Sequence, residues 1–402
     1  MKWLEIVKIK IFGSHDADTL GQITRCAEQE SVVGAVLCGD GHRGYNMPIG
    51  GVIAYRGKIS PAGVGFDIAC GNKAVLTNLV WDDIRKDFPK LMDTIFQSLS
   101  FGIGRVNTAE DVDDALFDDS AWTEIDVLST SGLRDKARRQ LGTVGSGNHY
   151  VDIFRDETDR IWIGVHFGSR GLGHTIASHY IRVAGGQPDG NMDAPPALLD
   201  AVSDEGQSYL RAMDIAGRYA YAGRNWVCTK VASILGAQIR DQVHNHHNFA
   251  WKESVMGGDA WVVRKGATPA FPGQRGFVGG SMGDVSVILE GVESPASRVA
   301  LYSTVHGAGR VMSRTQAAGK MFYKGPNKGK RVGGQVSWEM LQTWISDHGV
   351  ELRGGGTDES PHCYKRLPEV LACHAGTVRI LHTLHPLGVC MAGDDIVDPY
   401  KD

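Results

Sequence analysis

Asp67 and Cys70 bring a carboxylate and a thiol within three residues of each other in a glycine-rich stretch, Val64–Gly71. Both side chains bind divalent cations when deprotonated, and a thiolate sulfur can bridge two of them. A metal site built on Cys70 would need histidines from elsewhere in the chain. The alternative is a structural cysteine buried in a tight turn. These residues alone favour that alternative, because free cysteine is among the most buried residue types.

Three other segments contain histidines in a setting that is common at binding sites. His149 follows the glycine-rich loop 142–147, and His166 ends an apolar run. Each of these alone is more often a hydrogen-bonded core or surface residue. Three histidines within 244–247 favour metal or phosphate chemistry. Because only alternate residues of an extended segment share a face, we expect at most one or two of the three to serve one site.

His306 precedes a glycine-rich turn and has Arg310 and Arg314 close behind it. An imidazole in such a place could be a covalent nucleophile whose target phosphate the arginines neutralise. The imidazole must be neutral to attack, so acid should suppress the reaction. The loop 279–283, which is built mostly of small residues, is suited to a nucleotide.

Composition excludes several classes of protein. The formal net charge of -4 excludes a globally basic nucleic-acid binder, although a local basic groove remains open. The seven cysteines form no CxxC pair, which argues against a disulfide framework or a zinc ribbon and fits a reducing compartment. The chain has no signal-peptide pattern and no apolar run long enough to span a membrane. We therefore expect a cytoplasmic protein without a membrane partner.

The elements that must position these residues alternate between strands and helices without an internal repeat or a clear linker. The pattern predicts an α+β fold with a single domain over 1–402, in which 394–402 is an acidic tail. Predicted strands cover 1–12, 32–37, 52–55, 72–78, 161–165, 261–267 and 377–391. Predicted helices cover 16–30, 82–98, 131–141, 174–184, 336–347 and 366–376, with a long, broken helical region over 196–243.

The run 320–331 is the one clearly basic segment, and it contains Phe322 and Tyr323. Basic residues interleaved with aromatic ones can grip a nucleic-acid strand. A solvated lysine loop is an equally good interpretation of the run.

Seven motifs in one order, over almost the whole chain, resemble the RtcB family of RNA-splicing ligases. That family joins RNA 3'-phosphate or 2',3'-cyclic phosphate ends to 5'-hydroxyl ends. The resemblance implies a single large mixed α/β domain with a central metal and nucleotide cleft. The motifs are Asp67–Gly71, Gly145–His149, His166–Gly171, His246–Asn248, Arg264–Ala267, Gly280–Gly283 and His306–Arg314.

The resemblance also implies two manganese ions and GTP as cofactors, and RNA as the partner of a protein that acts as a monomer. Cys70 would bridge the two metals. Asp67 and His149 would complete one metal site, and His166 and His247 the other. His306 would attack the α-phosphate of GTP and hold GMP before it passes to an RNA 3'-phosphate, in tRNA splicing or RNA repair.

The family's other site residues also have counterparts at matching positions of this sequence. Arg170 and Arg310 would contact substrate phosphates, and Asp40 and His42 form a loop that borders the site. The nucleotide-binding residues would be Asn148, His149, Tyr150, Val151, Asp152, His247, Asn248, Gly279, Gly280, Ser281, Met282, Ser286, His306, Gly307, Ala308 and Gly309.

Four positions depart from the family's pattern. Ala69 replaces a glycine, which is costly if the backbone there needs a positive φ. Gly279 replaces a proline, and Asp152 replaces a glutamate. Ala392 stands where the family has the lysine that contacts guanine. Loss of that ammonium removes a charged hydrogen bond worth roughly 1–3 kcal/mol, and Lys401 in the tail is the one nearby candidate to replace it.

Ala392 therefore motivates an alternative, a related nucleotidyltransferase with altered nucleotide or end specificity. A non-catalytic RNA-binding homologue would form no covalent nucleotide. A metal-dependent phosphohydrolase would release phosphate from RNA ends without any nucleoside triphosphate.

Overall fold

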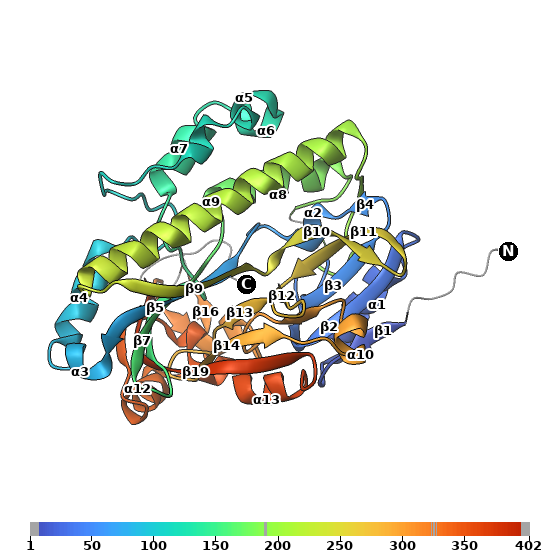
Figure 1. The fold of residues 1–402 in the computed structure, drawn as a ribbon. Helices are drawn as coiled ribbons and strands as arrows, with labels where there is room; N and C mark the ends of the chain where they lie inside the picture. The colour runs from blue at the N-terminus through green and yellow to red at the C-terminus, as the bar shows by residue number, and fades with distance from the viewer. Residues whose placement is uncertain (1–7, 189–190, 323, 325, 327, 395–402) are drawn as a thin grey trace.

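Two β-sheets form the centre of the protein in a computed structural model, which describes residues 8–188, 191–322, 324, 326 and 328–394 (Figure 1). The larger sheet has the order β13-β14-β19-β6-β7-β5-β9, with β18 paired parallel to β19. Its strands are β5 (Gly71–Val80), β6 (Tyr150–Arg155), β7 (Arg160–Phe167), β9 (Ile239–His246), β13 (Arg275–Val278), β14 (Ser286–Gly291), β18 (Glu351–Gly355) and β19 (Val378–Gly393).

The second sheet has the order β1-β2-β3-β11-β10. It is joined to the first through the chain, because β10 follows β9 after a single residue. The chain leaves β9 at His246 and enters β10 at Asn248, so His247 lies at the junction of the two sheets. The strands of this sheet are β1 (Ile9–Ile11), β2 (Val32–His42), β3 (Ile49–Tyr55), β10 (Asn248–Val255) and β11 (Gly258–Lys265).

Three short strand pairs add to the sheets. The pair of β12 and β15 matters most, because β15 ends immediately before His306. The pairs are β12 (Ala267–Pro269) with β15 (Ser303–Val305), β4 (Lys58–Ile59) with β8 (Leu199–Asp200), and β16 (Lys320–Met321) with β17 (Arg331–Val332).

Helix α9 (Asp204–Ile234) is the longest element and runs across the face of the larger sheet (Figure 1). The Ser203 hydroxyl caps it by accepting a hydrogen bond from the backbone N–H of Gly206 at 3.1 Å. Small buried residues such as Ala216, Ala220 and Gly223 let the helix approach its neighbours closely. Helix α8 (Arg170–Val183) packs beside it, and together they cover a large apolar cluster.

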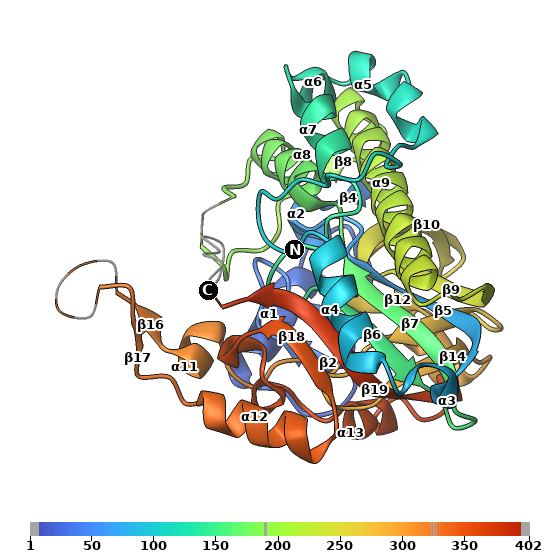
Figure 2. The same ribbon diagram turned by 90° about the vertical axis from the view of Figure 1, so that its left-hand side faces the viewer.

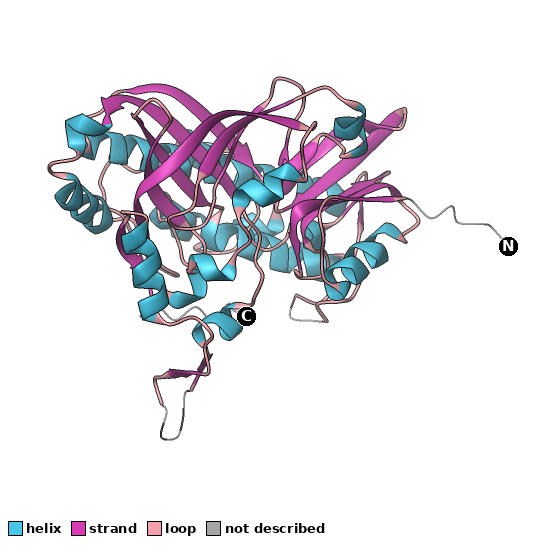
Figure 3. Ribbon diagram, turned by 90° about the horizontal axis from the view of Figure 1, so that it is seen from below, coloured by secondary structure: helices cyan, strands magenta, loops and turns pink. Residues whose placement is uncertain are grey.

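The other helices lie around the sheets, and a basic hairpin formed by β16 and β17 projects from the body (Figures 2 and 3). No helix among the described residues has both the length and the apolar character to cross a membrane. The remaining helices are α1 (Ala17–Ala27), α2 (Pro61–Val64), α3 (Trp81–Ile84), α4 (Phe88–Ser98), α5 (Ala121–Glu124), α6 (Asp126–Ser129), α7 (Leu133–Gln140), α10 (Pro295–Val299), α11 (Arg314–Ala318), α12 (Trp338–Asp347) and α13 (Leu367–Ala372).

The structure confirms the mixed α/β fold class and corrects several predicted elements. The predicted helical region 196–243 contains β8, α9 and most of β9, because Ile239–His246 pairs with β5 and tertiary pairing overrides the helical pattern. The predicted helix 82–98 is two helices, and the second one begins next to Pro89, which cannot continue a preceding helix. Of the predicted strand 1–12, residues 9–11 form β1 and residues 1–7 lie outside the described part.

Candidate active site

A cleft of about 360 Å³ opens where the two sheets meet. It collects the ends of strands from both sheets and the turn after β15. Its lining residues are His42, Arg43, Gly44, Tyr45, Ile49, Asp67, Cys70, Asn72, Asn148, His149, Tyr150, Asp152, His166, Met192, His247, Asn248, Gly266, Gly279, Gly280, Ser281, Met282, His306, Gly307, Ala308, Gly309, Arg310, Arg314, Glu359, Tyr364, Val389 and Met391.

The turn that carries Asp67 and Cys70 is held from both sides. It follows the short helix α2, and the backbone N–H of Cys70 donates to the carbonyl of Asp67 at 3.0 Å. Ala69 has a φ of 60°, the left-handed conformation that the sequence-based expectation identified as costly for a non-glycine residue. Its N–H donates to the Asn248 carbonyl at 2.7 Å, so tertiary contacts stabilise this conformation.

Gly71 in this turn and Gly168 beside it must be glycines, because other atoms lie too close to leave room for a side chain. A Cβ on Gly71 would lie 2.2 Å from the carbonyl oxygen of Asn245 in the paired strand β9. A Cβ on Gly168 would lie 2.2 Å from a carboxylate oxygen of Asp67. A side chain at either position would displace the turn or its carboxylate.

Potential metal-ligating atoms converge on Cys70. Its Sγ lies 3.2 Å from Nε2 of His166 and 3.6 Å from Nε2 of His149. His149 Nε2 lies 3.0 Å from Oδ2 of Asp67, and His166 Nε2 lies 3.3 Å from Nε2 of His247. The thiol therefore lies between an Asp67–His149 pair and a His166–His247 pair, and a thiol, a carboxylate and imidazoles suit a borderline divalent metal.

The backbone fixes which nitrogen of His166 faces the cluster. Nδ1 of His166 donates to the carbonyl of Asn148 at 3.0 Å, so the neutral ring presents a lone pair on Nε2 toward Cys70. Burial, together with the neighbouring His149 and His306, holds the pKa of His166 well below its ordinary value. Burial does the same for His247, so both imidazoles are neutral and able to act as ligands.

The acidic members of the cluster have opposite pKa shifts. Burial, reinforced by the charge of Asp67, raises the pKa of the Cys70 thiol well above its usual range. Burial would also raise the pKa of Asp67, but the hydrogen bond and charge of His149 outweigh it and lower that pKa to about 2. The free protein thus carries a carboxylate at Asp67 and a thiol at Cys70, and metal binding there would release the thiol proton.

His306 lies beside this cluster, with its ring centroid 4.8 Å from that of His247. Its Nδ1 donates to Oδ2 of Asp40 at 2.6 Å, and its backbone N–H donates to the same oxygen at 2.9 Å. Burial would raise the pKa of Asp40, but the charge of His306 and these hydrogen bonds lower it overall. The buried carboxylate therefore leaves Nε2 of His306 as the ring nitrogen with a lone pair.

Most of the sequence-predicted nucleotide-binding residues line the cleft, and two do not. Val151 lies on the opposite face of β6 from Tyr150 and packs in an apolar cluster. Ser286 is buried behind the cleft, where its hydroxyl accepts a hydrogen bond from the N–H of Gly280 at 2.9 Å.

Burial raises the pKa of Asp152, which lines the cleft, well above its usual value.

The two predicted phosphate-binding arginines are both engaged with other protein groups. Nη1 of Arg170 lies 3.4 Å from Nδ1 of His149, and this arginine is absent from the cleft lining. Arg310 lines the cleft, but its guanidinium pairs with Glu359 at 3.2 Å and donates to the Tyr364 hydroxyl at 2.8 Å. Arg170 therefore contacts the candidate metal ligand His149, and Arg310 belongs to an ion-pair network in the wall of the cleft.

Ala392, at the position expected to contact the guanine base, does not face the cleft. Ala392 points away from the cleft and packs against the apolar cluster that contains Phe88 and Met92. Val389 and Met391 line the cleft from the same strand, because alternate residues face opposite sides. Lys401 lies outside the described residues.

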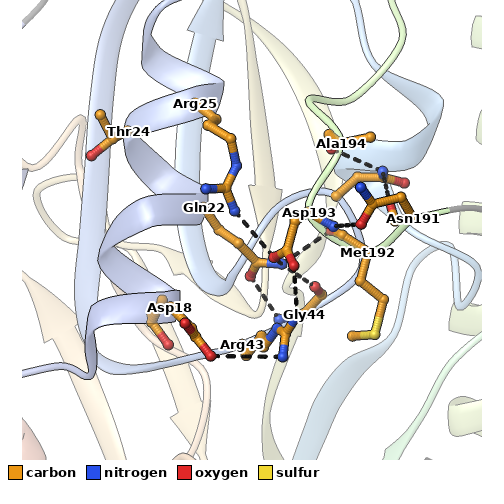
Figure 4. A network of polar contacts seen from close by, with 12 residues as sticks. Asp18, Gln22, Thr24, Arg25, Arg43, Gly44, Asn191, Met192, Asp193 and Ala194 are labelled. Atoms are coloured by element: carbon orange, nitrogen blue, oxygen red, sulfur yellow. Dashed lines mark hydrogen bonds and ion pairs between the residues drawn. The ribbon is translucent and has the colours of Figure 1, made fainter.

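A polar network around Asp193 (Figure 4) adjoins the cleft, because Arg43, Gly44 and Met192 belong to both. Its carboxylate accepts hydrogen bonds from Arg43 at 2.6 Å and from Arg25 at 3.1 Å. Gln22 donates to the carbonyl oxygens of Gly44 and Met192. The network ties α1 to the loop before β3 and to the loop after α8, and it sets the position of Met192 at the cleft.

Sequence reasoning missed several cleft residues. Asn72 donates to the carbonyl oxygens of Phe277 and His306, and so links β5 to the turn that bears the histidine. Glu359 and Tyr364 face the cleft from a segment that the prediction left without an element. The sequence just before them contains Gly354, Gly355 and Gly356, and this run of glycines is the signal that could have drawn attention to the segment.

The cleft belongs to a mixed α/β protein that gathers potential metal ligands beside a histidine held by a carboxylate. A sequence model described as tRNA-splicing ligase RtcB matches residues 22–392. The chain therefore belongs to the RtcB family, as the motif resemblance predicted.

Named relatives cover most of the chain. The tRNA-splicing ligase RtcB of Thermococcus kodakarensis is 32% identical over 434 residues, which cover 88% of this chain and 87% of the relative. The RNA-splicing ligase RtcB of Escherichia coli strain K12 is 31% identical over 407 residues, covering 94% and 95%. The RNA-splicing ligase RtcB homolog 1 of Entamoeba histolytica is 30% identical over 454 residues, covering 93% and 84%.

Proposed function

We propose that this protein is a GTP- and manganese-dependent RNA ligase. It joins RNA 3'-phosphate or 2',3'-cyclic phosphate ends to 5'-hydroxyl ends through a GMP bound covalently to His306. The observation that carries the proposal is the position of His306. Its Nδ1 is bound to Asp40 at 2.6 Å, and its ring lies 4.8 Å from that of His247 within the cluster of potential ligands.

The donor set in the cleft fits two divalent cations. Cys70 approaches His149 on one side and His166 on the other, so its thiolate would be placed to serve both cations. Asp67 and His149 would hold one cation, and His166 and His247 the other. Bound there, the two cations would neutralise phosphate charge and polarise the attacking and leaving oxygens.

The first step uses this chain's own nucleophile. Nε2 of His306 attacks the α-phosphorus of GTP, a nitrogen–phosphorus bond forms, and the bond to the β-phosphate oxygen breaks to release pyrophosphate. The attack places positive charge on the imidazole. Asp40 accepts the hydrogen bond from Nδ1, so its carboxylate stabilises that charge.

In the next steps the GMP passes to an RNA end. An oxygen of the RNA 3'-phosphate attacks the phosphorus of the histidine-bound GMP and frees His306. The 5'-hydroxyl oxygen of the second RNA end then attacks the phosphorus of the 3'-phosphate and gives its proton to water. The bond to GMP breaks, GMP leaves, and a phosphodiester bond forms. A cyclic phosphate must first be hydrolysed to the 3'-phosphate.

RNA is proposed as the partner, in tRNA splicing or RNA repair, because the relatives carry the names of tRNA-splicing and RNA-splicing ligases. The basic hairpin at β16 and β17 offers cations for RNA phosphates. The proposed ligase acts as a cytoplasmic monomer. The free cysteines among the described residues fit a reducing compartment, and light scattering after gel filtration would measure the mass in solution.

Intact-protein mass spectrometry tests the proposal. The protein is incubated with GTP and Mn²⁺, with and without a chelator, and digested to locate any adduct. We expect one GMP, on His306, that requires the metal. His306→Gln should take no adduct, and the matched control His179→Gln should take one, because His179 lies on α8 and does not line the cleft. An adduct on another residue, or none at all, would refute the covalent step.

A second candidate is a nucleotidyltransferase with a different base preference. Val389 and Met391, both apolar, line the cleft from β19, while Ala392 points away from it. Incubation with each labelled nucleoside triphosphate and Mn²⁺ separates the two candidates. Label from GTP alone supports guanine specificity, and equal label from ATP favours the second candidate.

A further inference from the structure

Arg224 is a fully buried cation that makes no ion pair with a carboxylate of the described residues. It lies on α9, beneath the turn that carries Cys70. A buried charge is costly unless polar groups surround it, and each nitrogen of the Arg224 guanidinium has at least one polar partner. Nη1 donates to the carbonyl oxygens of Ala69 at 3.0 Å and Phe167 at 2.5 Å, Nε donates to Nε2 of His244 at 2.8 Å, and Nη2 lies 3.0 Å from Nδ1 of His246.

Three of these four partners are direct chain neighbours of candidate metal ligands. Ala69 precedes Cys70, Phe167 follows His166, and His246 precedes His247. The three segments come from the turn before β5, the end of β7 and the end of β9, which are separated by long stretches of chain. One planar group therefore fixes the relative position of the three segments that supply the thiol and two of the imidazoles.

Attachment of α9 to the sheet does not need this cation. The same helix buries Tyr219, Val227 and Val231 completely or almost completely against the core. Apolar contacts of that kind hold a helix on a sheet without the cost of a buried charge. The hydrogen bond to the Ala69 carbonyl also stabilises the backbone at Ala69, which has a φ of 60°. The contacts of Arg224 are thus directed at the ligand-bearing segments.

We propose that Arg224 is a positioning residue that sets the spacing of Cys70, His166 and His247 for the metal pair. The proposal rests on the metal site of the proposed function. Arg224 contacts no substrate and acts through its hydrogen bonds to the backbone and to His246. Because a guanidinium offers five donors in a fixed plane, a lysine at this position would keep the charge but lose most of the contacts.

The test uses Co²⁺ as the probe, because a cobalt–thiolate bond gives a charge-transfer absorption band that reports directly on Cys70. Titrations compare the wild type with Arg224→Met, which removes charge and hydrogen bonds, and Arg224→Lys, which keeps the charge. The matched control is Arg218→Met on the same helix. Arg218 is half-exposed and forms surface ion pairs with Asp119 and Asp214.

We expect Arg224→Met to lose at least tenfold in Co²⁺ affinity and to show a weakened or shifted thiolate band, as for other residues that orient metal ligands. Arg224→Lys should fall between Arg224→Met and the wild type, and Arg218→Met should match the wild type. If Arg224→Met does not fold, the comparison rests on Arg224→Lys, which retains the charge and length of the side chain. Circular dichroism and thermal melting identify folded variants.

Wild-type affinity and an unchanged thiolate band in a folded Arg224 variant would overturn the inference. A wild type that binds Co²⁺ but takes no GMP from GTP would overturn the proposed ligation chemistry and leave the role of Arg224 standing. A wild type that binds no Co²⁺ would overturn both proposals.

Discussion

Replacement of Asp40 by asparagine changes the one charged contact that orients the proposed nucleophile. Asp40 is completely buried, and its Oδ2 accepts hydrogen bonds from Nδ1 and the backbone N–H of His306 at 2.6 and 2.9 Å. Asparagine has nearly the same shape but no charge. The backbone hydrogen bond survives if the amide oxygen keeps the place of Oδ2, whereas the charge-assisted bond to Nδ1 becomes an ordinary one.

The expected loss follows from that charge. A hydrogen bond to a charged group contributes about 1.5–3 kcal/mol, and the charge on the imidazole increases as Nε2 attacks phosphorus. The ordinary hydrogen bond that remains still contributes about 0.5–1.5 kcal/mol, so the replacement should raise the barrier of the guanylylation step by the difference, about 1–2 kcal/mol. At about 1.36 kcal/mol for each factor of ten, the rate constant should fall roughly 5- to 30-fold.

The assay is single-turnover labelling of the protein with α-labelled GTP and saturating Mn²⁺, quenched at intervals and counted after denaturing electrophoresis. Asp156→Asn is the matched control. Asp156 is also buried, and it accepts hydrogen bonds from Thr158, Arg160 and Trp162 at the turn between β6 and β7. This turn is at the end of the strands away from Tyr150 and His166, so Asp156→Asn should lower stability without slowing the labelling.

A labelling rate for Asp40→Asn within threefold of the wild type, with the protein folded, would refute the role of the carboxylate. Equal slowing of Asp40→Asn and Asp156→Asn would show that lost stability, and not the charge beside His306, controls the rate.

The remaining predictions concern stability, metal binding and RNA. Burial would raise the pKa of Glu359, but Arg314 and Arg310 lower it to about 2, so its charge stabilises the fold above pH 4.5 and this contribution is lost as pH falls from about 4.5 toward 2. Glu359→Gln should thus cost roughly 3 kcal/mol in unfolding free energy at pH 7 and almost nothing near pH 2, and denaturant titrations at pH 7 and at low pH would contradict this if the difference did not shrink. Cys70→Ala should abolish the binding of the metal pair and the proton release that accompanies it, measured by calorimetry in two buffers, and retention of two bound metals would exclude the bridging role. Glutamate at Lys324, Lys328 and Lys330 together should weaken RNA binding and flatten its dependence on salt, and unchanged binding curves would assign the basic run to a solvated loop.

The sequence by itself determined which side chains are available and much of the fold class. The order of Asp67, Cys70, His149, His166 and His306 within glycine-rich motifs was enough to predict the family, which the comparisons confirm. The mixed α/β class also followed from local patterns. These features could be predicted because they depend on residue types and short spacings, which do not need long-range contacts.

Local patterns failed where long-range pairing decides the structure. The sequence of residues 239–243 predicts the end of a helical region, but their backbone hydrogen bonds go to β5, so they belong to strand β9. That pairing also decides among the three neighbouring histidines. His247 faces His166, whereas His244 and His246 face Arg224.

The tertiary structure alone decided which distant residues touch. Asp40 meets His306 across 266 positions of the chain, Arg224 joins three segments that carry candidate metal ligands, and Ala392 turns away from the cleft that it was expected to border. Sheet register and the alternation of strand faces set these contacts, and both depend on the packing of the whole chain. Residue types therefore specified the chemistry that the protein can perform, and packing specified which groups are placed to perform it.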